Sequence, residues 1–156
     1  MKERYKTLSA VMLMLIRENN GTEEILLQKR KNTGYMDGHW DCSASGHVEN
    51  MESMKMAMKR EAREELCIDI DVHDLEFVSL IHKINGVDTI YYNGYFKAKK
   101  WKGEPKIGEP NKNEEIRWFD IHNLPDNLVD DRKDAIKNYI QKIPYSEFGW
   151  EERNLK

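Results

Sequence analysis

The apolar residues of the chain fall into short runs bounded by turn residues, a pattern typical of β-strands. Asn20-Gly21 and Asn85-Gly86 each lie between two such runs, and this dipeptide is the usual signal for a tight hairpin turn. The strands predicted in this way cover residues 8–17, 24–31, 40–45, 75–84, 88–99 and 116–119. The sequence therefore predicts a strand-rich fold that contains hairpins.

Two segments have the spacing of apolar residues expected for helices, at 53–66 and 131–143. The segments 32–39 and 102–113 are rich in glycine, proline and polar residues, which predicts loops. The last dozen residues carry no clear pattern. The order of strands, helix, strands and helix, without a repeat or a linker, predicts one α+β domain over residues 1–156, with helices packed on a mixed sheet.

Composition narrows the class of protein. The chain has 156 residues, of which 39% are hydrophobic, enough for one domain with a modest core. Its formal net charge is −3 and it has no long basic run, which argues against an extended nucleic-acid-binding surface. The two cysteines fit no disulfide or zinc pattern, so we expect free thiols and a cytoplasmic location. The apolar run 10–16 is too short to span a membrane and lacks a signal-peptide cleavage site, so we expect no membrane partner.

Three glutamates crowd the second half of the first predicted helix: Glu61, Glu64 and Glu65. On a helical wheel with about 100° per residue, the apolar residues of this helix form one stripe, which should pack on the sheet. Glu65 falls inside that stripe, Glu61 at its edge, and Glu64 about 60° beyond the edge. The stripe consists of Met54, Met58, Ala62 and Leu66. The acidic cluster therefore grows out of the buried face of the helix.

Two interpretations of this acidic cluster are open. A solvated acidic face with ion pairs along the helix is the common arrangement. However, Glu61 and Glu65 are i, i+4 neighbours, and like charges at that spacing destabilise a helix, the more so when they are buried. A divalent cation removes both penalties, and carboxylate oxygens are ligands that Mg²⁺ and Mn²⁺ prefer. Because Mg²⁺ usually binds through a few carboxylates together with substrate phosphates, the cluster also predicts a phosphate-bearing ligand.

The stretch GHVENMESMKMAMKREAREELCI, residues 46–68, resembles the sequence box of the Nudix hydrolases. That box has the form G-x5-E-x7-R-E-U-x-E-E-x-G-U, in which U is a bulky aliphatic residue. The matching residues are Gly46, Glu52, Arg60, Glu61, Glu64, Glu65 and Ile68. Two positions depart from the pattern, because Cys67 stands in place of the last glycine and Ala62 is smaller than the usual aliphatic residue. The glycine is expected to end the helix in a left-handed conformation, so Cys67 should affect the helix end and remove no ligand.

The resemblance extends beyond the box, through WDCSASGHVE before it and IRWFDIHNLP near the C-terminus, and covers roughly residues 5–143. It implies an α/β/α sandwich around a mixed sheet, and the metal-dependent hydrolysis of a diphosphate linkage in a nucleoside diphosphate derivative. A MutT-like, house-cleaning nucleoside triphosphate pyrophosphohydrolase is the first expectation. Hydrolysis of ADP-ribose, a dinucleoside polyphosphate or a capped RNA end stays open, as does a catalytically inactive nucleotide-binding regulator. Many relatives pair as dimers, so a homodimer is open as well.

The resemblance assigns Glu61, Glu64 and Glu65 as the catalytic carboxylates and as ligands of Mg²⁺ or Mn²⁺. One of them could also serve as the general base. The Gly46 carbonyl is expected to bind the metal too. Some family members add a glutamate from the loop before the last strand, and Glu114 or Glu115 is the candidate here, with Glu114 taken as the metal ligand and a solvated loop acid as the alternative.

Glu52 and Arg60 are expected to form a salt bridge that supports the loop and the helix. Four further residues are candidates for binding the nucleotide substrate: Arg30, Tyr35, Asp130 and Asp131. Arg30 could contact a phosphate or be a surface cation, and Tyr35 could stack on a base or cover the sheet edge. The two aspartates could read the edge of the base or cap the second helix.

Overall fold

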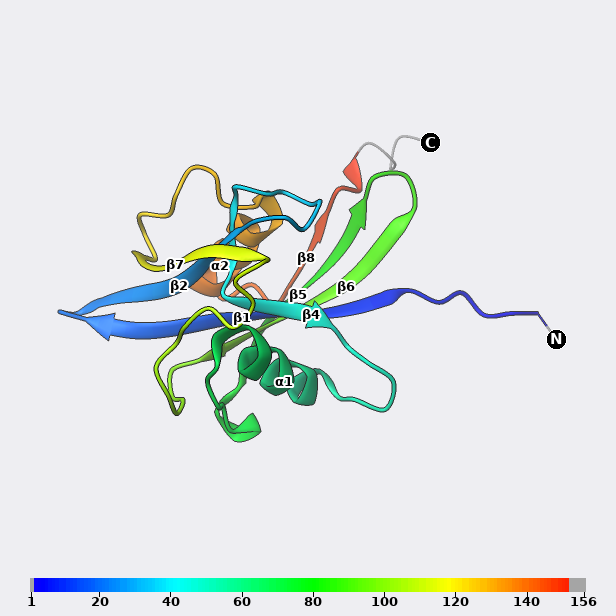
Figure 1. Ribbon diagram of the computed structural model, residues 1–156. Coiled ribbons are helices and arrows are strands. Elements are labelled where there is room, and N and C mark those ends of the chain that lie inside the picture. Colours follow the sequence, from blue (N-terminus) through cyan, green and yellow to red (C-terminus); the bar gives the residue numbers. More distant parts are fainter. Residues whose placement is uncertain (1, 152–156) are drawn as a thin grey trace.

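The computed structural model describes residues 2–151, in which eight strands and two α-helices form an α/β/α sandwich (Figure 1). One helix covers each side of the sheet. In chain order the elements are β1 (Leu8–Asn19), β2 (Thr22–Arg30), β3 (Trp40–Cys42), β4 (Ala44–His47), α1 (Met54–Leu66), a 3₁₀ turn (Val72–Asp74), β5 (Glu76–Asn85), β6 (Thr89–Ala98), β7 (Asn113–Asp120), α2 (Asp130–Gln141) and β8 (Tyr145–Phe148). The α+β fold with a mixed sheet is therefore confirmed.

The sheet is organised around β1, which pairs with β2, β4 and β6. The first half of β1 lies between β4 and β6, antiparallel to β4 and parallel to β6, and its second half forms a hairpin with β2. Ala10 is thereby paired directly with His47 on one side and with Asn93 on the other. Within the described part of the chain β4 pairs only with β1, so its outer edge is open to side chains from elsewhere.

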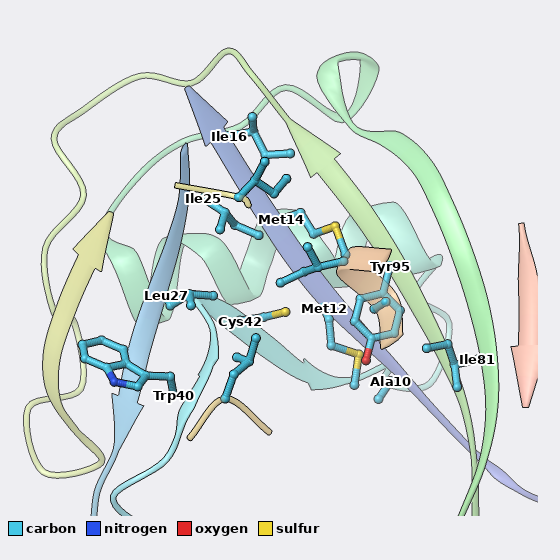
Figure 2. Packing of buried hydrophobic residues seen from close by; sticks show 14 residues of the cluster. Ala10, Met12, Met14, Ile16, Ile25, Leu27, Trp40, Cys42, Ile81 and Tyr95 are labelled. Atoms are coloured by element: carbon cyan, nitrogen blue, oxygen red, sulfur yellow. The ribbon is translucent and has the colours of Figure 1, made fainter. Parts of the chain in front are cut away.

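Residues 10–16 of β1 are buried in succession because both faces of the strand are covered. Successive side chains point to opposite faces and so join two separate hydrophobic clusters. One cluster contains Met12, Met14 and Tyr95 and packs under α2 (Figure 2). The other contains Val11 and packs under α1. In residues 2–151 no helix is long and apolar enough to cross a membrane.

The predicted hairpins and helices are confirmed, with ends that differ by at most two residues. The observed strands differ from the predicted ones in three places, and strand pairing explains each difference. The predicted strand 40–45 is two strands, because the chain leaves β2 at Ser43 and pairs with β1 instead. Strand β7 begins at Asn113, where it pairs with the end of β2. Strand β8, in the segment without a clear pattern, adds parallel to β5 at the sheet edge.

The predicted cap of the second helix is wrong. Helix α2 begins after Val129, which makes no side-chain capping bond, and Asp130 and Asp131 form its first turn. Carboxylates in the first turn still interact favourably with the helix dipole, which explains why the same residues looked like caps.

Helix α1 ends at Cys67, whose backbone adopts the left-handed conformation with φ 58° and ψ 32°. The Cys67 N–H donates to the carbonyl of Arg63 at 3.2 Å, as in a left-handed helix cap. The side chain is exposed. It therefore gains no packing that would offset the strain of a Cβ in this conformation.

We predict that Cys67→Gly raises the free energy of unfolding by about 1 kcal/mol, because glycine removes the left-handed strain but loses more backbone entropy on folding. Urea unfolding measures this difference. Cys67→Ala is the matched control, since it removes the sulfur and keeps the Cβ, and it should have the stability of the wild type. Equal stability of the two variants would show that this helix end carries no strain.

Candidate active site

Helix α1 is positioned by its N-terminal cap and its apolar stripe. The Ser53 hydroxyl accepts a hydrogen bond from a first-turn N–H at 3.1 Å. Glu61 and Glu65 lie beside the stripe and are half-buried, whereas the Glu64 side chain is 51% exposed. The fully buried residues of the helix are Ala57, Met58, Ala62 and Leu66, with Met54 half-buried. The predicted placement of the three glutamates on the helix is confirmed.

The glutamates of α1 lie against the open edge of β4. The Ser45 N–H donates to Oε2 of Glu65 at 2.7 Å. Gly46 lies so close to α1 that a Cβ at this position would be 2.1 Å from Oε1 of Glu61. A glycine is therefore needed at this point of β4 for the Glu61 carboxylate to pack where it does.

Arg60 connects β4, the loop before α1 and the glutamates. Its Nε and Nη2 donate to the two carboxylate oxygens of Glu52, at 2.8 and 2.9 Å, and Nη2 also donates to the His47 carbonyl at 3.1 Å. Its Nη1 donates to Glu61 at 2.7 Å and to Glu64 at 3.4 Å. The hydrogen bonds from Arg60 lower the pKa of Glu52 to about 2. The expected Glu52–Arg60 salt bridge is present, and it fixes the guanidinium among the glutamates.

Burial and like charge both act on the carboxylates of α1. Burial is the main cause that raises the pKa of Glu65 to about 8, with the Ser45 N–H opposing it and the charges of Glu61 and Glu109 adding to it. Burial also raises the pKa of Glu61, against the hydrogen bond from Arg60. Both groups therefore favour the uptake of a proton or of a cation.

The loop between β6 and β7 brings a fourth carboxylate to this cluster. The Gly108 N–H donates to the Glu65 carbonyl at 2.9 Å, at the C-terminal end of α1. A Cβ on Gly108 would lie 2.1 Å from the Glu64 carbonyl oxygen, so the loop touches the helix backbone. This contact delivers the next residue, Glu109, whose charge raises the pKa of both Glu61 and Glu65.

Glu114 was the predicted loop ligand. In the structure each loop acid pairs with a lysine at 3.2 Å, Glu114 with Lys29 and Glu109 with Lys112. The two differ in their effect on the cluster, because Glu109 is the one whose charge raises the pKa of Glu61 and Glu65. The available signal was Gly108, because a glycine directly before a glutamate in an ordered loop permits close approach to another backbone.

Backbone alternation in β4 decides which carbonyl faces the carboxylates. The Ser45 N–H and the His47 carbonyl both turn to the outer edge, where they bond to Glu65 and Arg60. In an extended strand the residue between them turns its N–H and C=O the opposite way, so those of Gly46 face β1. The carbonyl beside the carboxylates is therefore that of Ser45, whereas the sequence analysis expected that of Gly46.

The donor set of this site suits a hard divalent cation, because it consists of carboxylates and a carbonyl. Within residues 2–151 no three carboxylate, imidazole or thiol side chains already converge closely enough to hold a metal ion. The hydrogen bonds explain this, since Arg60 engages Glu61 and Glu64 while Ser45 engages one oxygen of Glu65. The site nevertheless fits such an ion, because burial disfavours the unpaired negative charges of Glu61 and Glu65 and the strand approaches them closely at Gly46. To bind the ion, the glutamates would turn away from Arg60.

A cavity of about 410 Å³ lies on the α2 side of the sheet and reaches the same strand β4. Its floor is the sheet face that includes Ala10, Met12 and Asn93. Its rim includes Ser45 and Gly46, which touch the carboxylates of α1. A ligand that fills the cavity therefore ends beside the glutamate cluster.

A chain of buried ion pairs forms one wall of this cavity. Arg132 donates to Asp41 at 2.6 Å and to Asp131 at 2.5 Å. Lys83 pairs with Asp131 at 3.1 Å, and Arg30 pairs with Asp41 at 2.7 Å. Burial alone would raise the pKa of Asp41, but Arg132 and Arg30 more than offset it and lower the pKa. Asp41, Lys83 and Arg132 are not among the predicted site residues, because a pair such as Asp41–Arg132, 91 residues apart, leaves no local signal.

The predicted substrate residues fall in different places. Arg30 lines the cavity, but its donors are already engaged by Asp41, by the Tyr35 carbonyl and by a threonine of the same loop. Tyr35 also lines the cavity, and its hydroxyl lies 3.2 Å from Nζ of Lys83. Asp131 is buried behind the wall, whereas the Asp130 side chain is 77% exposed. The structure thus brings Arg30 and Tyr35 to the cavity and leaves Asp130 outside it.

Comparison with known proteins gives one family and one fold. The profile of the NUDIX domain matches residues 6–139. A MutT NUDIX hydrolase from Burkholderia pseudomallei superposes with a TM-score of 0.74 at 24% identity, covering 86% of this chain and 98% of that one. The MutT protein from Methanosarcina mazei Go1 gives 0.72 at 17% identity, covering 90% and 98%. The NUDIX domain of Shewanella oneidensis NrtR, complexed with ADP ribose, gives 0.70 at 16% identity, covering 90% of each chain. No curated protein sequence matches the chain.

The raised pKa of Glu65 predicts a stability that depends on pH in metal-free protein. The folded pKa is about 8 and the ordinary value 4.5, so the folded state keeps a proton that the unfolded chain releases. The stability that this bound proton contributes to the folded state is fully present below pH 4.5 and is lost as the pH rises through about 8. Glu65→Gln stays neutral, so relative to the wild type it should gain about 1 kcal/mol per pH unit across this window.

Urea unfolding of both proteins with a chelator present, at several pH values, measures this gain. Near pH 4.5 the pair should differ least, which serves as the internal control. A difference in unfolding free energy that stays constant with pH would contradict the burial of an ionisable carboxylate at this position.

Proposed function

The chain belongs to the Nudix family, and from this premise we propose that it hydrolyses a diphosphate linkage in a nucleotide with the help of Mg²⁺ or Mn²⁺. The first candidate is the MutT-like reaction, in which water attacks a nucleoside triphosphate and a monophosphate and pyrophosphate leave. One observation carries the proposal: the carboxylates of α1 and the cavity meet at the same short strand, β4.

The chain's own residues divide the work. Glu61, Glu64 and Glu65 would hold the cation, with Glu109 and the Ser45 carbonyl as further ligands. A divalent ion bound there would neutralise phosphate charge and promote ionisation of the attacking water. One of the carboxylates would take the proton of that water.

Other linked nucleotides are the second candidate. The NUDIX domain of NrtR has the same fold and is complexed with ADP ribose, which supports a nucleotide with a ribose on its terminal phosphate as an alternative substrate. An inactive regulator is less favoured, because every glutamate of the box is present. Incubation with a panel of nucleotides and Mg²⁺ or Mn²⁺ tests these options. Release of pyrophosphate supports the MutT-like reaction, and release of two phosphorylated products other than pyrophosphate, such as two monophosphates from ADP-ribose, supports a linked nucleotide. No turnover of any substrate contradicts the proposal.

We predict that Glu64→Gln and Glu65→Gln each lower kcat by about 100-fold or more on the best substrate of that panel, because an amide is a poor cation ligand and cannot accept the proton of water. Steady-state kinetics at saturating Mg²⁺ measure the loss. Circular dichroism controls for folding. Wild-type rates in either folded variant would refute the assignment of these carboxylates.

Glu109→Gln and Glu114→Gln form a matched pair, since both remove one carboxylate from the same part of the chain. We predict that Glu109→Gln raises the Mg²⁺ concentration needed for half-maximal rate by about tenfold, because the charge of Glu109 acts on the cluster. Glu114→Gln should stay within about twofold of the wild type, because Glu114 is not among the main charges that raise the pKa of Glu61 and Glu65, although both loop acids pair with a lysine. Mg²⁺ titrations of the rate compare the two, and the reverse order of effects would return the role to Glu114.

A further inference from the structure

Asn93 is a buried amide in the cavity floor without a hydrogen-bond partner for its side-chain oxygen. The residue is 2% exposed, and its Oδ1 makes no hydrogen bond in the structure. Leaving a buried acceptor unpaired costs free energy, so such atoms call for an explanation. We propose that Asn93 is a specificity-determining residue, which hydrogen-bonds the edge of the substrate's base. This inference rests on the proposed function and names the part of the substrate that the cavity holds.

The register of the sheet places Asn93 about one nucleoside length from strand β4, on which the carboxylates pack. Ala10 lies between His47 of β4 and Asn93 of β6, so the two are two strand spacings apart. At about 4.8 Å per spacing this is roughly 10 Å. A ligand that touches both Asn93 and the rim at Gly46 therefore has the length of a nucleoside, which a bare pyrophosphate lacks.

The cations around this end of the cavity already have anionic partners in the protein. Arg132 and Lys83 are each buried and paired with Asp131, and Arg132 is paired with Asp41 as well. The guanidinium of Arg30 donates to Asp41 and to two residues of the loop that follows β2, Thr33 and Tyr35. Three cations share the two carboxylates of Asp41 and Asp131, so one net positive charge remains, spread over side chains that already donate to protein partners. A polar group that accepts or donates hydrogen bonds fits this end, and the proposed cation places the phosphates on the glutamate side.

The side chains beside Asn93 suit a flat ring. Tyr35 and Tyr91 line the same cavity, and Ala10 and Met12 give it an apolar floor. The amide of Asn93 offers an acceptor next to a donor, the combination with which asparagine pairs the edge of a nucleobase. The ligand edge that fits is an N–H or amino group next to a carbonyl or ring nitrogen.

Two variants test Asn93, and nucleotide binding is measured without hydrolysis. Asn93→Leu keeps the branched shape and the number of heavy atoms and removes both hydrogen-bonding groups, whereas Ser79→Ala is the control. Ser79 is also buried with an unpaired oxygen, but it lies outside the cavity lining. Calorimetry in the presence of chelator, with the nucleoside monophosphates as probes, gives Kd. Asn93→Leu should weaken the best binder by about tenfold or more and flatten the order of affinities among bases. Ser79→Ala should leave the order unchanged.

The same variants are then compared for turnover of the best nucleoside triphosphate and of ribose 5-triphosphate, which has no base. The ratio of kcat/KM for these two substrates should fall about tenfold in Asn93→Leu, through KM. An unchanged ratio together with an unchanged order of affinities overturns the inference, as would failure of all monophosphates to bind the wild type. Base-selective binding by the wild type without turnover of any substrate overturns the proposed reaction alone. Thermal unfolding of each variant confirms that it is folded.

Discussion

The contact between α1 and the open edge of β4 is the constraint on which the site depends. Strand β4 pairs only with β1 in the described residues, so its outer N–H and C=O groups need other partners. Glu65 accepts from Ser45, and Arg60 donates to His47, so two charged side chains take the place of a neighbouring strand. The approach also requires Gly46, where any Cβ would meet Glu61. The packing of α1 on β4 therefore satisfies the edge of the sheet and brings the carboxylates together at the same time.

Buried carboxylates on the two sides of β4 differ in how their charge is compensated. Asp41, on the cavity side, is fully buried, yet its pKa is lowered because Arg132 and Arg30 bracket it. Glu65, on the α1 side, has its pKa raised because burial and its acidic neighbours outweigh one backbone N–H. The first group is satisfied by the fold itself and braces the wall of the cavity. The second is not satisfied by the fold, and it belongs to the group of carboxylates that we propose as ligands of the cation.

What the sequence could predict follows from how local each signal is. The placement of Glu61, Glu64 and Glu65 depends on helical periodicity alone, so it was predicted correctly. The outward carbonyl depends on the register of β4 against β1, and pattern alone could not separate Ser45 from its neighbour.

Tertiary contacts account for most of the remaining differences. The Asp41–Arg132 pair joins β3 to α2 across most of the chain, and neither residue has a local motif. Glu109 reaches the cluster through the contact of Gly108 with a helix end, which no periodicity encodes. Strand β8 spans only Tyr145–Phe148 and is half exposed, too short for alternation to distinguish it from a loop.

Arg60 shows why the box needs a guanidinium at this position. It bonds both oxygens of Glu52, a β4 carbonyl and the carboxylates of Glu61 and Glu64 at once, which uses the fixed fork of five N–H donors. If a cation draws Glu61 and Glu64 away, the paired bonds to Glu52 still hold the Arg60 side chain. Glu52 stays ionised through the neutral range because its pKa is about 2. A lysine could keep only part of this set, because its single nitrogen cannot span Glu52 and the strand while also neutralising the glutamates. The same residue can thus stabilise the metal-free cluster and then release it without losing the geometry of β4 and α1.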